Sequence, residues 1–320
     1  MNMNTFKKIG LTALAGSLVV TSAYAGSMSV SGGASLGLKN TSKSASGKSW
    51  TMGNQLTFSG SGELDNGMNV SLSFVLDQAD DSTTGIANAP FDSHSLTISS
   101  DSLGKLVFSG EGGSSAQSAI DTTAAGDLWD NGSGFGTPKA SEAGNNSMMY
   151  TLPSIMDDLT VNVSMSPGGA GGSSATAWAL TYSGVEGLTA NYGVGETNTV
   201  GSEAETTTMK ASYAIGSFTV AASNTEHAYD LASQNDEEVS SWKVSYTVSD
   251  DMSVTYGQET IETESSAVDE EGEKISVSYT TGGVTLAASQ YEFSGKGNSN
   301  TETATSGDVE RWSLSATFAF

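Results

Sequence analysis

Polar and apolar residues alternate one by one in many short runs along the chain. The final run, 309–320, shows this clearly, because Trp312, Leu314 and Phe318 alternate with Ser313 and Ser315. Successive side chains of a β-strand point to opposite faces, so this period of two predicts strands with one apolar and one polar face.

Sixteen such runs can be identified, and together they predict an all-β chain. They lie at 28–38, 50–64, 68–77, 92–99, 104–110, 147–152, 159–166, 175–183, 187–194, 206–214, 217–224, 239–248, 252–260, 273–281, 283–292 and 309–320. After residue 25, no stretch of the sequence approaches the ~20 apolar residues of a membrane-spanning helix.

Short and long connections alternate between these runs. Short joins include Asp65-Asn66-Gly67, which is a tight hairpin signal, and Ile215-Gly216. The long joins are 39–49, 78–91, 111–146, 167–174, 195–205, 225–238, 261–272 and 293–308. This sorting is typical of an up-and-down barrel and not of a Greek-key sandwich, so the sequence predicts a transmembrane antiparallel β-barrel of about sixteen strands. An even number of strands returns the last one beside the first and leaves no open edge in lipid.

The width of such a barrel decides which face of each strand meets water. A ring of about sixteen strands is too wide for side chains to fill, so its interior holds water and its polar face points inward. The apolar face then meets lipid, which fits a chain with only 37% hydrophobic residues. Trp178, Trp242 and Trp312 begin three strands that descend from the long-loop end, and we expect them in an aromatic girdle at the lipid–water interface.

The first 25 residues have the features of a signal peptide. Lys7 and Lys8 precede a short apolar core, and Ala23 and Ala25 occupy the positions that signal peptidase requires to be small. The core is too short to cross a ~30 Å hydrocarbon layer as a helix. We expect cleavage after Ala25, with residues 26–320 forming the barrel.

Charge and motifs exclude several classes of function. The formal net charge of −24 argues against nucleic acid, whose binding proteins need basic patches. The chain has no Cys, which excludes disulfides and thiol chemistry. His94 and His227 are the only histidines, and no hydrolase, metalloprotease or phosphate-loop motif is present, so we predict no enzymatic activity.

With its export signal, alternating connections, long third loop and C-terminal Trp312…Phe318-Ala319-Phe320, the sequence resembles the sixteen-stranded Gram-negative general porins of the alphaproteobacterial type. The resemblance implies a homotrimer in the outer membrane of a Gram-negative bacterium, passive diffusion of ions and small hydrophilic solutes, and no cofactor. It also implies that the third loop folds into the lumen. Phe320 resembles the signal that the barrel assembly machinery reads.

Charged residues suggest how the pore is narrowed. The third loop, 111–146, is the expected constriction, and its acids are Asp121, Asp127, Asp130 and Glu142. The arginine cluster that the family sets against such acids cannot be carried over, because Arg311 is the only arginine. Several basic residues instead fall at the alternate strand positions whose side chains point into the barrel. They predict an arc of positive charge on one wall, formed by Lys39, Lys210, Lys243, Lys274 and Arg311.

Two interpretations of this arc follow from the sequence. In the first, the arc faces the acidic loop across the pore and creates a transverse field that disfavours apolar solutes and biases ion selectivity. In the second, the cations are polar lumen residues paired with nearby acids such as Glu238 and Glu273.

Acidic pairs and triplets in the long joins are candidates for a weak Ca²⁺ site. They include Asp80 and Asp81, and Asp269, Glu270 and Glu271. Clustered carboxylates bind Ca²⁺ through oxygen, and such ions could bridge to lipopolysaccharide phosphates. No run matches an EF-hand loop, so solvated loops are the simpler interpretation.

Two alternative functions fit part of the pattern. A substrate-selective channel, for example for sugars, would need an aromatic track in the lumen, and Trp129 in the third loop is the aromatic residue placed to contribute. A secreted β-rich surface or adhesion protein would not insert into a membrane and would be soluble without detergent.

Overall fold

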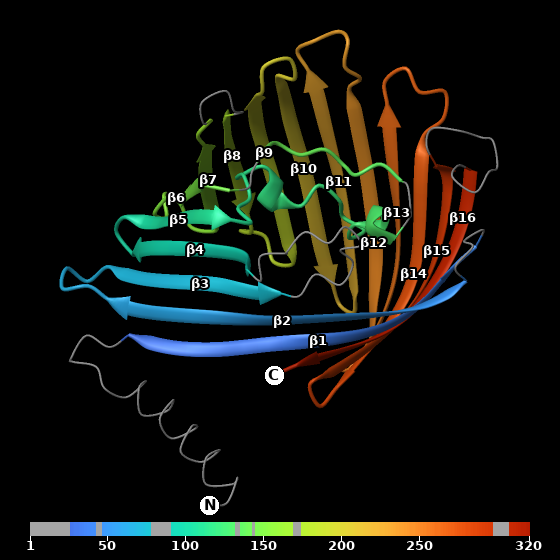
Figure 1. Ribbon diagram of the computed structural model, residues 1–320, viewed down its shortest axis with the longest axis horizontal. Coiled ribbons are helices and arrows are strands. Elements are labelled where there is room, and N and C mark those ends of the chain that lie inside the picture. Colours follow the sequence, from blue (N-terminus) through green and yellow to red (C-terminus); the bar gives the residue numbers. More distant parts are fainter. Residues whose placement is uncertain are drawn as a thin grey trace, which may run out of the picture.

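Sixteen antiparallel strands close into one barrel, in which β1 pairs with both β2 and β16 (Figure 1). The computed structural model describes residues 26–42, 47–77, 91–131, 135–142, 145–168, 174–296 and 307–320. The strands are β1 (Ser27–Thr41), β2 (Lys48–Glu63), β3 (Asn69–Asp77), β4 (Phe91–Ser100), β5 (Gly104–Glu111), β6 (Ser147–Thr151), β7 (Leu159–Ser166), β8 (Ser174–Tyr182), β9 (Leu188–Asn198), β10 (Ala204–Ile215), β11 (Phe218–Tyr229), β12 (Glu237–Ser249), β13 (Met252–Thr263), β14 (Glu270–Thr281), β15 (Val284–Lys296) and β16 (Gly307–Ala319). The prediction of a closed sixteen-stranded barrel is confirmed.

Two short 3-10 helices, η1 (Ser118–Ile120) and η2 (Leu128–Asn131), lie in the connection between β5 and β6. Within the described ranges, no helix is long and apolar enough to cross a membrane. The predicted signal peptide, residues 1–25, lies outside the described residues.

Several strands run further toward the long-loop end than the alternation predicts. β11 continues to Tyr229, β13 continues to Thr263, and β14 begins at Glu270. The added residues are polar on both faces, so the apolar signal that marks a strand fades. The backbone ladder nevertheless continues through them, for example between His227 and Glu237.

The strands present their apolar side chains outward. In β10, Met209 and Tyr213 are 53% and 39% exposed, whereas the alternating residues Thr206 and Thr208 are fully buried. The same phase places Trp178 and Trp242 outside, where their rings lie 5.5 Å from those of tyrosines on the next strand. A barrel with apolar side chains outside and polar ones inside is suited to lipid around it and water within it.

The barrel closes through its C-terminus. The Phe320 N–H donates to the Gly32 carbonyl at 3.0 Å, and the Gly32 N–H donates to the Phe320 carbonyl at 2.8 Å. Leu38 lies opposite Leu314 in the same ladder. No unpaired backbone edge is therefore left between the first and last strands.

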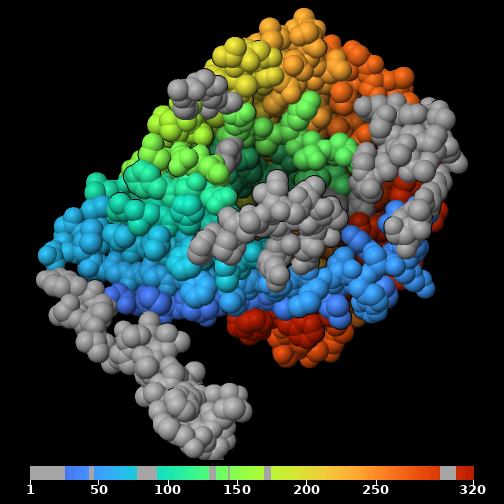
Figure 2. Space-filling view, in the orientation of Figure 1, coloured from blue at the N-terminus to red at the C-terminus, as the bar shows by residue number. Residues whose placement is uncertain are grey.

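The connection between β5 and β6, residues 112–146 and called loop 3 below, folds into the barrel. Figure 1 shows it in green along the inner side of β9 to β13, and Figure 2 shows green atoms within the hollow. Glycines on the wall make room for it: a Cβ on Gly193 would lie 2.6 Å from Ile120, and one on Gly257 would lie 2.9 Å from the Ala125 Cβ. The loop therefore packs against strand backbone at these points.

Candidate functional site

The first half of loop 3 is hydrogen-bonded to one strand after another. The Ala116 N–H donates to Ser164 of β7, the Gln117 amide to Thr208 of β10, the Ala125 N–H to Ser241 of β12, and the Leu128 N–H to Glu259 of β13, while Ser223 of β11 donates to the Thr122 carbonyl. These donor–acceptor distances are 2.7–3.0 Å. The loop has little secondary structure of its own, so the wall supplies partners for its backbone groups.

The second half of loop 3 returns along the same wall. The Gly136 N–H donates to Glu270, the Lys139 N–H donates to Glu237 at 2.8 Å, and the Glu142 N–H donates to Thr197 at 3.1 Å. Loop 3 is thus a hairpin lying on the inner faces of β9 to β14.

Three wall glutamates, Glu237, Glu259 and Glu270, are central to this arrangement, and their role was not predicted from the sequence. Each accepts a backbone N–H of loop 3, and each is 4–8% exposed. Glu237 and Glu270 fall in the predicted long joins 225–238 and 261–272, and Glu259 falls in the predicted strand 252–260. The useful signal was strand phase, because Glu259 shares the inward face of β13 with Gly257.

The strand register places three of the predicted basic residues in one row. Across β12 to β16, directly paired residues read Lys243, Gly257, Lys274, Tyr291 and Arg311. We call Lys243, Lys274 and Arg311 the cation row. The Lys274 Nζ and the Arg311 Cζ lie 5.6 and 5.9 Å from the centroid of the Tyr291 ring. Lys39 faces inward on β1 and pairs with Ser313, two residues nearer the short-turn end than Arg311.

Lys210 differs from the other basic residues in its height on the barrel wall. The row of Lys243 reaches β10 at Ser212, and Lys210 lies two residues nearer the long-loop end, a distance called one register step below. Its row continues through Ser223, Ser241 and Glu259, which are the residues that bind loop 3. The Lys210 Nζ accordingly lies 2.6 Å from Asp121 Oδ2 and donates to the Thr123 carbonyl at 2.9 Å.

Asp121, Asp127 and Glu142 of loop 3 therefore lie on the same wall as the cations, and for these acids the expected arrangement across the pore is not found. Asp121 pairs directly with Lys210. Glu238 and Glu273, the partners suggested by the alternative interpretation, lie in the outward phase of β12 and β14. Asp127 accepts a hydrogen bond from Thr123 at 2.9 Å, and Glu142 accepts one from Thr199 at 3.2 Å. The side chain of Asp130 lies outside the described part of the chain.

The candidate Ca²⁺ residues that the structure describes do not come together. Glu270 and Glu271 belong to β14, so their side chains point to opposite faces; the prediction that they share a loop with Asp269 is wrong. Asp80 and Asp81 lie outside the described residues. Among the described residues, no group of three or more His, Asp or Glu side chains could hold a metal ion.

Aromatic residues inside the barrel serve to pack loop 3. Tyr291 and Phe293 are 5% and 3% exposed, and the Phe135 ring of loop 3 lies 4.7 Å from that of Phe293. Leu128 joins the same cluster. Trp129, the aromatic residue expected to line a track, lies in η2 beside this cluster. Because Tyr291 and Phe293 are buried, they do not offer an open stacking surface to a sugar.

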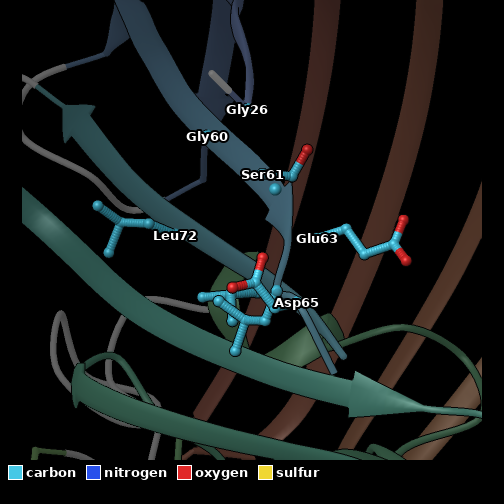
Figure 3. A pocket seen from close by; sticks show the side chains of 9 residues that line it. Gly26, Gly60, Ser61, Glu63, Asp65 and Leu72 are labelled. Atoms are coloured by element: carbon cyan, nitrogen blue, oxygen red, sulfur yellow. The ribbon is translucent and has the colours of Figure 1, made fainter. Parts of the chain in front are cut away.

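The inner face of β1 to β5 is different: among the described residues loop 3 makes no side-chain hydrogen bond to it, and at the end of the loop the Asn146 N–H donates to the Gly110 carbonyl of β5 at 3.2 Å. Its inward positions are mainly Ser, Thr and Gly, as in the pairs Ser73–Ser95 and Ser71–Thr97. Apart from this inner face, a pocket of about 530 Å³ at the turn between β2 and β3 is lined by Gly26, Ser61 and the outward-facing Leu72 among others (Figure 3). This pocket lies at the short-turn end, away from the residues that contact loop 3.

Comparison with known proteins gives a family and a set of similar folds. The family model described as Gram-negative porin matches residues 10–272. No curated protein sequence matches the chain. OmpT of Vibrio cholerae with loop L8 deleted matches 92% of this chain and 100% of its own, with 15% identity and a TM-score of 0.72.

Two further solved structures show the same fold. The anion-selective porin from Comamonas acidovorans matches 92% of this chain and 100% of its own, with 14% identity and a TM-score of 0.66. The trimer form of Vibrio cholerae OmpT gives the same coverage, with 12% identity and a TM-score of 0.64.

Proposed function

The chain belongs to the Gram-negative porin family and forms an outer-membrane channel for passive diffusion, and we propose that this channel sorts ions and small hydrophilic solutes by size and charge, with loop 3 as its constriction. The observation that carries the proposal is the docking of loop 3 on the inner wall, hydrogen-bonded to β7 and to β9 through β14. A loop held in this way narrows the lumen without filling it.

Permeation of graded solutes tests this proposal. Purified protein in liposomes should admit neutral sugars at rates that fall smoothly with their size, and planar bilayers should show discrete conductance steps. A strong preference for one sugar over another of equal size would instead support a substrate-selective channel. Protein that stays soluble without detergent and opens no channel would support the secreted surface protein.

The charged residues would set the selectivity of this channel. The cation row and Lys39 face the lumen, and the acids of loop 3 lie beside them on the same wall. We assign Lys210 and Asp121 to holding loop 3, because they bind each other. Lys39, Lys243, Lys274 and Arg311 are then the residues that act on permeating ions.

The outer surface supports a homotrimer that packs through β1 to β5. On these strands most outward residues are apolar, as at Trp50 (70% exposed) and Leu72 (48%). On β11 to β13, by contrast, Glu226, Glu238 and Glu262 face outward directly opposite one another near the long-loop end. A close subunit contact is disfavoured where carboxylates line the surface. One solved structure of similar fold is a trimer form.

Matched substitutions on the two walls test this contact. Leu72→Asn should weaken the trimer in detergent, measured as mass by light scattering, because it places an amide in the contact. Val220→Asn on β11 has a similar exposure, 42%, and should leave the trimer intact. Equal behaviour of the two variants would contradict the placement of the contact.

Assembly is proposed to follow the route that the C-terminus suggests. After removal of residues 1–25, recognition of Phe320 by the barrel assembly machinery would precede closure of β16 on β1. The outward glutamates at the long-loop end would then lie at the lipopolysaccharide headgroups.

Phe320→Ala should lower the amount of protein in the outer membrane while leaving detergent-refolded protein able to form channels. Equal loss in cells and in refolding would indicate a purely structural role.

A further inference from the structure

The two lysines of the cation row have no acidic partner. Within the described residues, neither Lys243 nor Lys274 makes an ion pair, in contrast to Lys210 with Asp121 and Lys139 with Glu237. Gly257 lies between them in the row, and a Cβ there would approach the Lys243 Cβ to 3.2 Å. The Ala125 Cβ of loop 3 takes the place that a side chain at Gly257 would fill, so no side chain of the wall stands between the two lysines.

The carboxylates nearest to this row already have donors. Asp121 binds Lys210, and Asp127 accepts from Thr123. Glu259 and Glu237 accept backbone N–H groups of loop 3. These acids are directed toward the loop and the wall, and they are therefore poor partners for a cation passing through the lumen.

Loop 3 packs on the row at Gly257 and Tyr291, whereas Lys243 and Lys274 stay partly exposed. Loop 3 covers the residues one register step nearer the long-loop end, such as Ser241 and Glu259. Lys243 and Lys274 occupy alternate strands, so their backbones are roughly 10 Å apart given a ~4.8 Å strand spacing. This separation is close to the ~8 Å Debye length at physiological ionic strength, so their fields overlap in the pore.

The facing wall does not balance this charge. The inward residues of β2 to β4 are mainly hydroxyl-bearing, as at Ser73, Ser95 and Thr97. Two inward carboxylates lie on these strands: Asp77 pairs in register with Gln55 and lies two strands away from Lys39, and Glu63 pairs with Asn69 at the short-turn end. Many of the remaining acids, such as Glu226, Glu238 and Glu262, face outward and away from the lumen.

We infer that the channel prefers small anions to cations, although the chain carries a formal charge of −24, and that Lys243 and Lys274 are the residues that determine this preference. Small inorganic anions and the anions of carboxylic acids are the solute class that this surface fits. The inference deepens the proposed function and rests on it, because it concerns the selectivity of the same pore.

Zero-current potentials of purified, refolded protein in planar bilayers test the inference. Under a KCl gradient, wild-type channels should be more permeable to Cl⁻ than to K⁺. Coulomb's law in water, weakened by salt screening over about one Debye length, gives roughly a 1.4-fold change for each ion at ~8 Å, in opposite directions for Cl⁻ and K⁺, and so roughly a twofold change in their ratio for each charge removed. Lys243→Gln with Lys274→Gln should therefore lower the ratio of Cl⁻ to K⁺ permeability about fourfold, whereas the double Arg variant should keep it.

Lys48→Gln is the matched control for this double variant. Lys48 is exposed on the outer surface, where its Nζ lies 5.8 Å from the centroid of the Trp312 ring, so removal of this one charge should leave the permeability ratio unaltered. Open channels that prefer K⁺ in the wild type, or a double Gln variant with an unchanged ratio, would overturn the inference. Absence of any channel would overturn the proposed function instead.

Discussion

The inner faces of β10 to β12 and of β2 to β4 differ in what their inward residues contact, although the alternation along both groups of strands is alike. Thr206, Thr208 and Thr225 are 0–1% exposed, because loop 3 and neighbouring side chains cover them. Ser73 and Ser95, in the same phase on the other wall, remain partly exposed. The comparison shows that the docked loop, more than the strand pattern, decides whether an inward hydroxyl packs against protein or faces the pore.

Removal of the wall carboxylates should have the largest effect on the difference between the two walls, because these groups hold loop 3 on one of them. Replacing Glu237, Glu259 and Glu270 together by Ala leaves three loop N–H groups without acceptors, at about 1–3 kcal/mol each. Loop 3 should leave the wall, so single-channel conductance should fluctuate and proteases should cut the loop. Ser71, Ser73 and Ser95 replaced by Ala on the other wall should have neither effect. A triple Glu variant with wild-type conductance and protease resistance would contradict the role assigned to the glutamates.

The second largest effect should come from adding one methyl group to a glycine on each wall, which should lower the stability of the protein more on the wall that loop 3 contacts. In Gly257→Ala the new Cβ would lie 2.9 Å from the Ala125 Cβ, so loop 3 has to shift, at a cost of about 1–3 kcal/mol. In Gly53→Ala the closest atom is the Ser35 hydroxyl oxygen at 2.8 Å, which can rotate away. The free energy of unfolding in urea should fall clearly for the first variant and little for the second. Equal losses would show that the loop does not press on Gly257.

The ion pair between Lys210 and Asp121 should contribute less to the stability of the docked loop than the contact at Gly257 does. Asp121 is 48% exposed, so water and salt screen the pair, and its coupling energy should be about 0.2–1 kcal/mol. A double-mutant cycle with Lys210→Met and Asp121→Asn measures this coupling. It should shrink as salt is raised, and a coupling that is large and independent of salt would contradict a partly exposed pair.

The smallest effect concerns the outer surface. Glu238 lies directly opposite both Glu226 and Glu262, and like charges in such positions are destabilising. Glu238→Gln should therefore raise the free energy of unfolding by a few tenths of a kcal/mol at low salt, about the lower end of such cross-strand effects. The gain should disappear in high salt, where these charges are screened. A loss of stability would indicate that the hydrogen bond from Asn224 to Glu238 matters more than the repulsion.

The number of strands, their order and the long third loop could be predicted because they follow from local alternation and from the lengths of the joins. Strand ends at the long-loop side were harder, because residues such as Glu226 and Glu270 have polar neighbours on both faces and leave no periodic signal. The backbone ladder extends the strands through them regardless.

The site was only partly predictable, since it depends on register between distant segments. Lys210, Lys243 and Lys274 look equivalent in sequence, each near the start of a descending strand. One register step separates Lys210 from the other two, and that step brings it to Asp121. The glutamates that bind loop 3 backbone were invisible for the same reason, because a backbone N–H leaves no mark in the sequence of the loop.

A disulfide between loop 3 and the wall is the most direct test of the docked constriction. A Cβ on Gly272 would lie 3.7 Å from the Leu128 Cβ, close to the ~3.8 Å found in disulfides, and the natural chain has no cysteine to interfere. Protein with Leu128→Cys and Gly272→Cys should form this bond on mild oxidation, detected by mass after digestion, and its oxidised and reduced channels should conduct alike. Failure to form the bond, or a large drop in conductance when it forms, would contradict a loop that rests on this wall beside an open pore.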